Sequence, residues 1–329
     1  MEALEEGDFC FPHINNSCRW LKRPEVETTL IYIVLSIIIL LTVVLNLLVI
    51  ISISHFRQLQ TTTNLLLLCM AVADFLVGLL QMPLLLLHNQ GCWLLGDVMC
   101  AVHYFLGFVV ISVSVGSMVL ISVDRYIAIC DPMFYTTRVT MARVKFCVFM
   151  CWICSLVHAS WILGDFLKRP NMHNSCHGDC VVVVNFAEGI VDLVVTFLGP
   201  ILIIVILYSR VFVVAVSQAR AMRTHVAAIT LGRPEKVKAE KSEVKAARTL
   251  GIVVVVFLLC SSPYYCFAVA AETNLVGASS AGIEIWFLYC NSTLNPVIYV
   301  FFYPWFRKTI KHIVSLQILK PGSGKIQVL

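Results

Sequence analysis

Seven long runs of apolar residues, separated by polar segments, dominate the chain. They cover residues 29–54, 62–87, 98–123, 142–164, 183–208, 247–271 and 281–303. A bilayer core of about 30 Å is crossed by about 20 helical residues at a rise of about 1.5 Å each, and every run reaches that length. At this length only helices satisfy all backbone groups inside lipid. The pattern predicts an all-α membrane protein built as a bundle of seven transmembrane helices.

Positive charges are sorted by side of the predicted bundle. If the N-terminus lies outside, 19 of the 24 Lys and Arg residues fall in cytosolic segments, nine of them between Arg210 and Arg248. Such a bias sets orientation, so we expect an extracellular N-terminus and a cytosolic C-terminus. The net charge of +5 is therefore a topology signal. We expect membrane lipid, and no nucleic acid, among the partners.

The polar segments predict one domain with a tail at each end. Residues 1–28 are expected to form an extracellular tail, in which Asn15-Asn16-Ser17 is an acceptor pattern for glycosylation of Asn15. The bundle follows over 29–303. Basic and apolar residues alternate at helical spacing over 304–318, which predicts an amphipathic helix in the inner interface. Residues 319–329 are predicted to be a disordered cytosolic tail.

The cysteines divide by compartment. Six of the 14 fall in outside segments or at the mouths of the spans: Cys10, Cys18, Cys92, Cys100, Cys176 and Cys180. An even number facing an oxidising space indicates three disulfides, but six cysteines allow 15 connectivities. The other eight are expected to be small buried hydrophobes, and none has the spacing of a zinc site. No metal ligands are therefore assigned.

Ionisable residues inside a span are costly, so each is a functional candidate. Asp74 and Asp192 lie deep in the second and fifth spans. Asp124 and Arg125 end the third, and Glu188 lies near the outer mouth of the fifth. The simpler alternatives are an interfacial Asp124–Arg125 pair and a solvated Glu188. For the two deep acids, the alternative is a structural hydrogen-bond role.

Residues in all seven spans resemble the pattern of rhodopsin-class G-protein-coupled receptors. They are Asn46, Ala73-Asp74, Asp124-Arg125-Tyr126, Trp152, Pro200, Tyr208, Phe257, Pro263 and Asn295-Pro296-Val297-Ile298-Tyr299. A narrower resemblance, to the trace-amine-associated receptors, is carried by Glu243, the segment 245–252, Ile285-Trp286, Cys290-Asn291-Ser292, the segment 302–308 and the pair Cys176 and Cys180. The resemblance implies a multi-pass plasma-membrane receptor, not an enzyme, that couples a small ligand to a heterotrimeric G protein.

The resemblance also implies a switch at the cytosolic side. Arg125 near Glu243 would form an ion pair that holds the third and sixth helices together at rest, and its loss would admit a G protein. Ser261 stands where the class usually carries a tryptophan that moves on activation, which leaves Phe257 and Tyr264 or Tyr265 to pass on the signal. The residues assigned to activation and coupling are Asp124, Arg125, Tyr126, Tyr208, Glu243, Phe257, Ser261, Asn295, Pro296 and Tyr299.

A sodium site is implied by the same resemblance. Its oxygen ligands would be Asp74, Ser114, Asn291, Ser292 and Asn295. In this class such an ion favours the resting state. Apart from this allosteric Na⁺, no cofactor is expected.

A disulfide pairing is implied as well. Cys100 would pair with Cys180 and join the third helix to the second outer loop. The narrower family implies the pairs Cys10–Cys176 and Cys18–Cys92, which would tie the tail over the mouth of the bundle.

Gly107 is the largest departure from the receptor pattern. Counting forward from Cys100 and back from Asp124 reaches this position, where aminergic receptors place the aspartate that binds an ammonium. No acid occurs anywhere over 98–123. Asp192 lies eight residues before Pro200, at the depth where these receptors usually hold serine or threonine. Fish trace-amine-type receptors that have moved the acid to the fifth helix are similar, so we expect Asp192 to bind the ammonium.

The rest of the predicted ligand site surrounds this acid. Its residues are Asp192, Glu188, Thr196, Gly107, Phe108, Tyr104, Ile111, Tyr264, Tyr265, Trp286 and Tyr289. The aromatic members would enclose the ligand through burial and cation–π contact. Aromatics near span ends also form interfacial belts, which is the alternative. Glu188 could bind the second ammonium of a diamine.

The sequence therefore predicts a chemosensory, olfactory receptor for small biogenic amines that signals through a stimulatory G protein and cAMP. The rival is a rhodopsin-class receptor for a non-amine ligand, with Asp192 in a structural hydrogen-bond network. A retinal protein would need a lysine in the seventh helix, and 278–303 contains none. A transporter would show internal repeats. An enzyme would need a catalytic pair or a metal cluster, and His88, His103 and His158 are expected to be isolated helix-end or packing residues.

Overall fold

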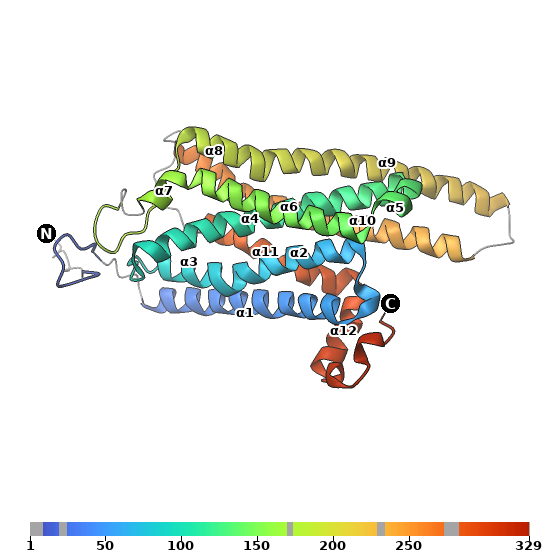
Figure 1. Cartoon of the computed structure of the whole chain (residues 1–329), viewed down its shortest axis with the longest axis horizontal. Helices are drawn as coiled ribbons and strands as arrows, with labels where there is room; N and C mark the ends of the chain where they lie inside the picture. The colour runs from blue at the N-terminus through green and yellow to red at the C-terminus, as the bar shows by residue number, and fades with distance from the viewer. Residues whose placement is uncertain (1–8, 20–24, 170–173, 229–233, 273–282, 329) are drawn as a thin grey trace.

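The computed structural model describes residues 9–19, 25–169, 174–228, 234–272 and 283–328, with side chains outside this description at 25–28, 215, 216, 218–228, 234–250, 271 and 272. Seven helical spans run alongside one another in the long direction of the molecule (Figure 1). Each described span is long and apolar enough to cross a bilayer. The predicted seven-helix bundle is therefore confirmed.

The spans begin and end close to the apolar runs. Their bounds are α1 (Glu25–His55); α2 (Thr62–Leu76) continuing through a π-helical turn (Val77–Gln81) into α3 (Met82–His88); α4 (Gly96–Cys130); α6 (Met141–Ile162); α8 (Phe186–Leu193) continuing through a π-helical turn (Val194–Leu198) into α9 (Gly199–Ala228); α10 (Pro234–Glu272); and α11 (Ile283–Phe302). Short helices α5 (Pro132–Arg138), α7 (Gly164–Lys168) and α12 (Pro304–Val314) lie between or after them.

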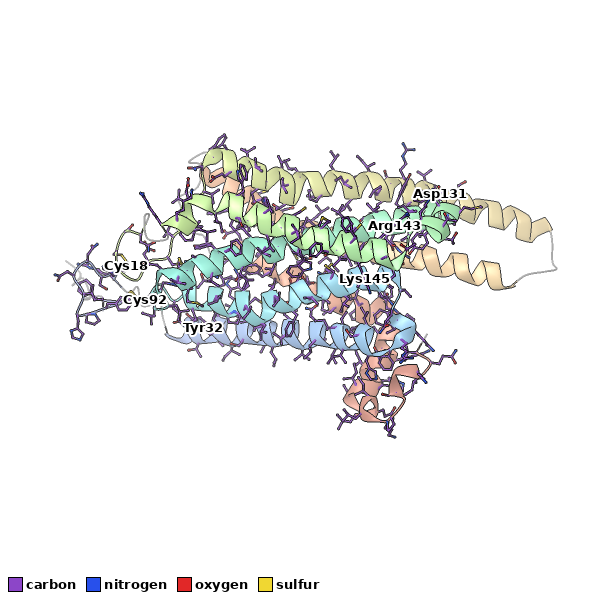
Figure 2. The ribbon with its side chains drawn as sticks, in the orientation of Figure 1. Cys18, Tyr32, Cys92, Asp131, Arg143 and Lys145 are labelled. Carbon is purple, nitrogen blue, oxygen red and sulfur yellow. A yellow bond between two sulfur atoms is a disulfide. The ribbon has the colours of Figure 1, made fainter. Side chains whose placement is uncertain are left out.

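Side-chain caps set the cytosolic starts of three helices. Thr61 accepts from the backbone N–H of Asn64 at the start of α2, and Asp131 and Thr140 do the same for α5 and α6. Such caps satisfy backbone donors that have no partner in the first turn of a helix. In Figure 2, Asp131 and Arg143 lie toward one end of the bundle, and Cys18 and Cys92 lie at the other. The capped ends and the disulfide-bonded end are thus on opposite sides of the membrane.

Two π-helical turns interrupt spans at the same depth as the site described below. Gln81 ends the turn in the second span, and Thr196 lies within the turn in the fifth. A π turn inserts an extra residue and rotates the following part of the helix. This rotation aims side chains that a regular helix of the same sequence would place elsewhere.

The cytosolic tail does not match its prediction as disordered. Residues 317–319 and 323–325 form 3₁₀ turns, and the chain returns to the inner end of α1 (Figure 1). The backbone N–H of Val328 donates to Gln58 Oε1 at 3.2 Å, and Ser323 Oγ lies 2.9 Å from His55 Nε2. Val328 is fully buried in the hydrophobic cluster at the inner end of the bundle. The prediction was wrong because the burial of Val328 depends on residues far away in the sequence.

Three disulfides join the outer segments, and two differ from the predicted pairing. Cys100 pairs with Cys180, as the resemblance implied, but Cys10 pairs with Cys92 and Cys18 with Cys176. The implied pairs Cys10–Cys176 and Cys18–Cys92 are therefore replaced by the exchanged set. All six cysteines take part, so the number of bridges is as predicted.

Backbone hydrogen bonds of the tail explain the exchange. The N–H of Cys18 donates to His177 O at 2.9 Å, which places Cys18 beside its partner Cys176. The N–H of Cys10 donates to Cys18 O at 2.9 Å, so the tail doubles back over Gly178. Gly178 has φ of +103°, and a Cβ there would approach Cys10 Cβ to 3.0 Å. Asn15 lies exposed on this tail, and its glycosylation stays a prediction.

We predict that replacing Cys18 and Cys176 together by serine removes one bridge and leaves the other two intact. The bridge closes a long loop, so its loss should lower the free energy of unfolding by about 2–4 kcal/mol, measured as a lower melting temperature of the solubilised receptor. The matched pair Cys18→Ser with Cys92→Ser breaks two bridges and should cost more. Non-reducing peptide mapping of the unaltered protein checks the pairing directly. A peptide linking Cys10 to Cys176 would contradict it.

Candidate functional site

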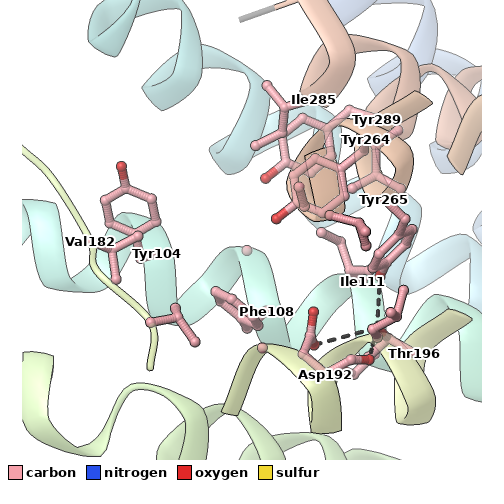
Figure 3. A pocket seen from close by; sticks show the side chains of 18 of the residues that line it. Tyr104, Phe108, Ile111, Val182, Asp192, Thr196, Tyr264, Tyr265, Ile285 and Tyr289 are labelled. Carbon is pink, nitrogen blue, oxygen red and sulfur yellow. Dashed lines mark hydrogen bonds between the residues drawn. The ribbon is translucent and has the colours of Figure 1, made fainter. Parts of the chain in front are cut away.

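A cavity of about 380 Å³ lies in the outer part of the bundle (Figure 3). Its wall is built by the second, third, fifth, sixth and seventh spans and by the loop that precedes α8. The lining residues are Gln81, His103, Tyr104, Gly107, Phe108, Ile111, Ser112, Val182, Val184, Phe186, Gly189, Ile190, Asp192, Leu193, Thr196, Tyr264, Tyr265, Ala268, Val269, Ile285, Leu288 and Tyr289. Its volume suits a small organic molecule.

Most of the residues predicted for the ligand site lie on this wall. They are Asp192, Thr196, Gly107, Phe108, Tyr104, Ile111, Tyr264, Tyr265 and Tyr289. In Figure 3, Asp192 and Thr196 lie on one side of the space, with Tyr264 and Tyr289 across it. Helical spacing on four different spans thus brings the predicted residues to one cavity.

Glu188 and Trp286 are exceptions. Glu188 Oε2 accepts from the backbone N–H of Asn185 at 3.1 Å and caps the first turn of α8. Its carboxylate therefore satisfies its own helix, away from the cavity wall. Trp286 is buried behind the wall, in a hydrophobic cluster with Met82 and Val110. The neighbouring Ile285 lines the cavity in its place.

The carboxylate of Asp192 is held by neighbours on its own and adjacent helices. Thr196 Oγ1 donates to the Asp192 carbonyl at 2.6 Å and lies 3.4 Å from Asp192 Oδ1 (Figure 3). The same hydroxyl oxygen lies 2.7 Å from the hydroxyl of Tyr265 on α10. Thr196 follows Asp192 by four residues, the spacing at which a threonine hydroxyl reaches the carbonyl of the preceding helical turn. This places one buried negative charge at the cavity wall, where the side chain is 15% exposed.

His158 on α6 is a member of this group that sequence reasoning missed. Its Nε2 lies 3.6 Å from Asp192 Oδ1, and its Nδ1 lies 3.2 Å from Ser112 Oγ. The expectation that the histidines are isolated was wrong. His88 and His103 also stack on each other with ring centroids 5.9 Å apart. No spacing in the sequence links His158 to Asp192, because the two lie on different helices.

Gln81 explains the absence of a third-helix acid. Its Nε2 donates to the His103 carbonyl at 2.7 Å and to the Tyr289 hydroxyl at 3.3 Å. A Cβ added at Gly107 would collide with this amide nitrogen and would approach the Tyr289 hydroxyl to 3.2 Å. The side chain of Gln81 therefore occupies the space that an acid at 107 would need. Gln81 has no signature in the sequence, since a glutamine in a span is more often a packing residue.

The charge on the wall is of one sign. Among the lining residues that the structure describes, Asp192 is the only carboxylate and none is Lys or Arg. Phe108, Tyr264 and Tyr289 add aromatic faces around it. A negative group in a largely apolar, aromatic cavity suits a ligand with one cationic end and an apolar body.

A second polar cluster lies deeper, around Asp74. Ser114 and Ser292 donate to Oδ1 of Asp74 at 3.2 Å and 2.8 Å, and Asn295 Nδ2 donates to Oδ2 at 2.8 Å. The amide oxygens of Asn291 and Asn295 are buried without a hydrogen-bond donor among the described residues. The carboxylate, the two hydroxyls and the two amide oxygens are oxygen ligands of the kind that a hard cation such as Na⁺ prefers.

The inner end of α4 carries a compact ion pair. Arg125 Nη2 lies 2.6 Å from Asp124 Oδ2, and the same carboxylate accepts from Thr63 at 2.8 Å and from Tyr135 at 3.0 Å. The network joins α2, α4 and α5. The side chain of Glu243, the expected partner of Arg125 on α10, lies outside the described residues.

The other residues assigned to activation are placed through the core. Phe257 and Tyr299 belong to the main hydrophobic cluster, and Tyr208 packs against it. Tyr126 packs against a smaller cluster of Ile129 and Val211, and Pro296 lies inside α11. Ser261 is fully buried, and its hydroxyl has no hydrogen-bond partner in the described part of the chain.

Comparisons with known proteins place the chain among receptors. A family model described as "7 transmembrane receptor (rhodopsin family)" matches residues 45–299. The chain is 36% identical to Trace amine-associated receptor 13c of Danio rerio over 99% of this chain and 98% of that protein. It is 36% identical to Trace amine-associated receptor 8a of Rattus norvegicus (97% and 96% covered) and 35% identical to Trace amine-associated receptor 1 of Macaca mulatta (97% and 98% covered).

The contact between Gly107 and Gln81 yields a prediction. Gly107→Ala should lower the free energy of unfolding of the receptor by about 1–3 kcal/mol, because the added methyl group would collide with the amide of Gln81, which its hydrogen bonds hold in place. Adding Gln81→Ala should recover part of this loss, so the two substitutions should be non-additive in the melting temperature of the solubilised protein. Strictly additive effects would show that the two side chains do not meet.

Proposed function

This chain belongs to the rhodopsin family of seven-transmembrane receptors, and we propose that its ligand is a small amine whose ammonium binds Asp192 on α8. It is a multi-pass plasma-membrane protein that couples a small-molecule ligand to a G protein, and it is not an enzyme. The observation that carries the proposal is the single sign of permanent charge on the cavity wall: one carboxylate, and no Lys or Arg among the described lining.

The energetics favour a cationic ligand. An ammonium about 4 Å from a carboxylate gains on the order of 4 kcal/mol at an effective dielectric of about 20, less the cost of removing both ions from water. Asp192 is already largely out of water, so part of that cost is met in the folded receptor. Tyr264 and Phe108 provide aromatic faces for the apolar body and for cation–π contact. The relatives whose names refer to trace amines support the same ligand class.

The non-amine alternative keeps one supporting observation. Asp192 already has Thr196 and His158 as neighbours, so it could serve a structural network alone. In that case a neutral isostere of Asp192 would change folding and expression more than ligand selectivity. The alternative is therefore distinguished by comparing surface expression with amine potency in the same variant.

The signalling partner in this proposal is a stimulatory G protein, read out as cAMP, in olfactory sensory neurons. Support comes from the family and from the ion pair at the inner end of α4, which joins three helices next to the expected G-protein surface. Detection of the transcript in olfactory epithelium would test the chemosensory role. A cAMP reporter in cells that express the receptor would test the coupling.

An allosteric sodium ion completes the proposal. Asp74, Ser114, Ser292, Asn291 and Asn295 would hold it, and it would supply a positive charge to a fully buried carboxylate. The ion would stabilise the resting arrangement, because it ties together residues from α2, α4 and α11. Outward movement of helices on activation would loosen that set.

We predict that Asp192→Asn lowers amine potency by about 100-fold, equivalent to about 3 kcal/mol, because the amide keeps the shape but cannot pair with the charge. A panel of n-hexylamine, 2-phenylethylamine and cadaverine, each compared with its neutral alcohol, provides the measurement in a cAMP assay.

Glu188→Gln is the matched control. It also neutralises an acid on α8, but this acid caps its own helix, so potency should stay within about threefold. Surface expression of both variants is measured with an N-terminal epitope tag. Unchanged amine potency in Asp192→Asn at normal expression would rule out the fifth-helix amine site.

A further prediction concerns coupling. Arg125→Ala should abolish amine-stimulated cAMP, whereas Glu243→Ala and Asp124→Asn should each raise basal cAMP by a few-fold, because the resting state loses a partner of Arg125. Basal signal is normalised to surface receptor. If basal cAMP were unchanged or lower in both variants, these acids would not hold the resting state.

A further inference from the structure

A line of polar side chains crosses the bundle behind the amine-binding acid. Ser112 on α4 contacts His158 on α6 at 3.2 Å, and His158 faces Asp192 on α8 at 3.6 Å. Thr196 then lies 3.4 Å from the same carboxylate oxygen and 2.7 Å from the Tyr265 hydroxyl on α10. Four helices thus contribute to one row of polar groups in an otherwise apolar layer.

The partners of the imidazole assign its tautomer. Nε2 faces Asp192 Oδ1 at 3.6 Å without a hydrogen bond, and a proton on this nitrogen is the arrangement that avoids repulsion between two lone pairs. The other nitrogen then accepts from the Ser112 hydroxyl, which can reverse its role and accept if the ring gains a second proton. The same site can therefore hold either a neutral imidazole or an imidazolium without moving a heavy atom.

We propose that His158 positions Asp192 for the amine and, when protonated, competes with the amine for that carboxylate. The proposal rests on the amine site proposed above. In the neutral form, the Nε2–H of His158 points its dipole at Oδ1 from 3.6 Å and leaves the full negative charge for the ligand. In the protonated form, the imidazolium neutralises Asp192 from behind, and the ligand meets a pair with no net charge. The receptor would then respond to amines less at acid than at alkaline extracellular pH.

Apart from His158 and Asp192 itself, the titratable groups near the site do not supply this effect. Tyr264 and Tyr265 on α10 line the same cavity, and a phenol ordinarily stays neutral over this pH range. His103 on α4 also lines the cavity, but its ring packs against His88, Trp93 and Tyr104.

The ligand does not supply the effect either. An aliphatic ammonium keeps its proton throughout the range from pH 6 to 8. Histidine is the side chain whose charge changes there. A pH effect on potency is therefore a property of the receptor.

The experiment measures the half-maximal concentration of the most potent amine of the panel between pH 6 and 8, on cells that express the full receptor. In the unaltered receptor this concentration should rise by about 3- to 10-fold as pH falls, since linkage allows up to about tenfold per pH unit. His158→Gln offers a donor where Nε2 stood but does not titrate. It should abolish the pH dependence and keep the potency of the unaltered receptor at pH 8 within about threefold.

Two further variants separate this role from a merely structural one. His158→Leu should be less potent than His158→Gln at every pH and equally flat, because it neither orients nor neutralises Asp192. His103→Gln, which alters the other histidine on the wall, should keep the pH dependence whatever its potency. Cyclase stimulation by forskolin at each pH corrects for effects on the reporter.

The outcomes distinguish this inference from the proposed function. If Asp192→Asn loses the amine response while the unaltered receptor is equally potent at pH 6 and 8, the amine site stands and the role of His158 is wrong. Full pH dependence in His158→Gln would overturn the inference in the same way. If Asp192→Asn keeps its amine potency, the proposed function itself fails.

Discussion

A carboxylate inside a membrane-spanning bundle must have its charge compensated, and the outer half of this receptor is arranged around that constraint at Asp192. The acid is placed at the edge of a cavity rather than in lipid, beside a threonine and a histidine from neighbouring helices. These partners hold the carboxylate but supply no permanent positive charge. The remaining charge is available to a cationic ligand, which is why an amine suits the site better than a neutral molecule.

The same constraint accounts for the rest of the pocket. With the acid on the fifth span, the usual position on the third span is left as Gly107, and Gln81 fills the space with its amide. Two π turns lie at this depth, one ending at Gln81 and the other containing Thr196. The Cys100–Cys180 disulfide ties to α4 the second outer loop, whose Val182 and Val184 line the cavity.

The sequence was sufficient for the architecture because its signals are long and local. Apolar runs of membrane length located every span, and residues at helical spacing placed Asp192, Phe108 and Tyr264 on one cavity. What it could not predict depends on contacts between segments far apart. Trp286 falls behind the wall because the rotation of α11 is set by packing, and the cysteine pairs exchange because the tail doubles back. The roles of His158 and Gln81 could not be predicted, because their partners lie on other helices.

The most direct test of the account is a cryo-electron microscopy structure of the receptor bound to an activating amine. The account predicts that the ammonium nitrogen lies about 2.7–2.9 Å from the carboxylate of Asp192, the range of charge-assisted hydrogen bonds, with the apolar body toward Tyr264 and Tyr289. An ammonium bound instead near Gln81, with Asp192 paired only to His158 and Thr196, would contradict it.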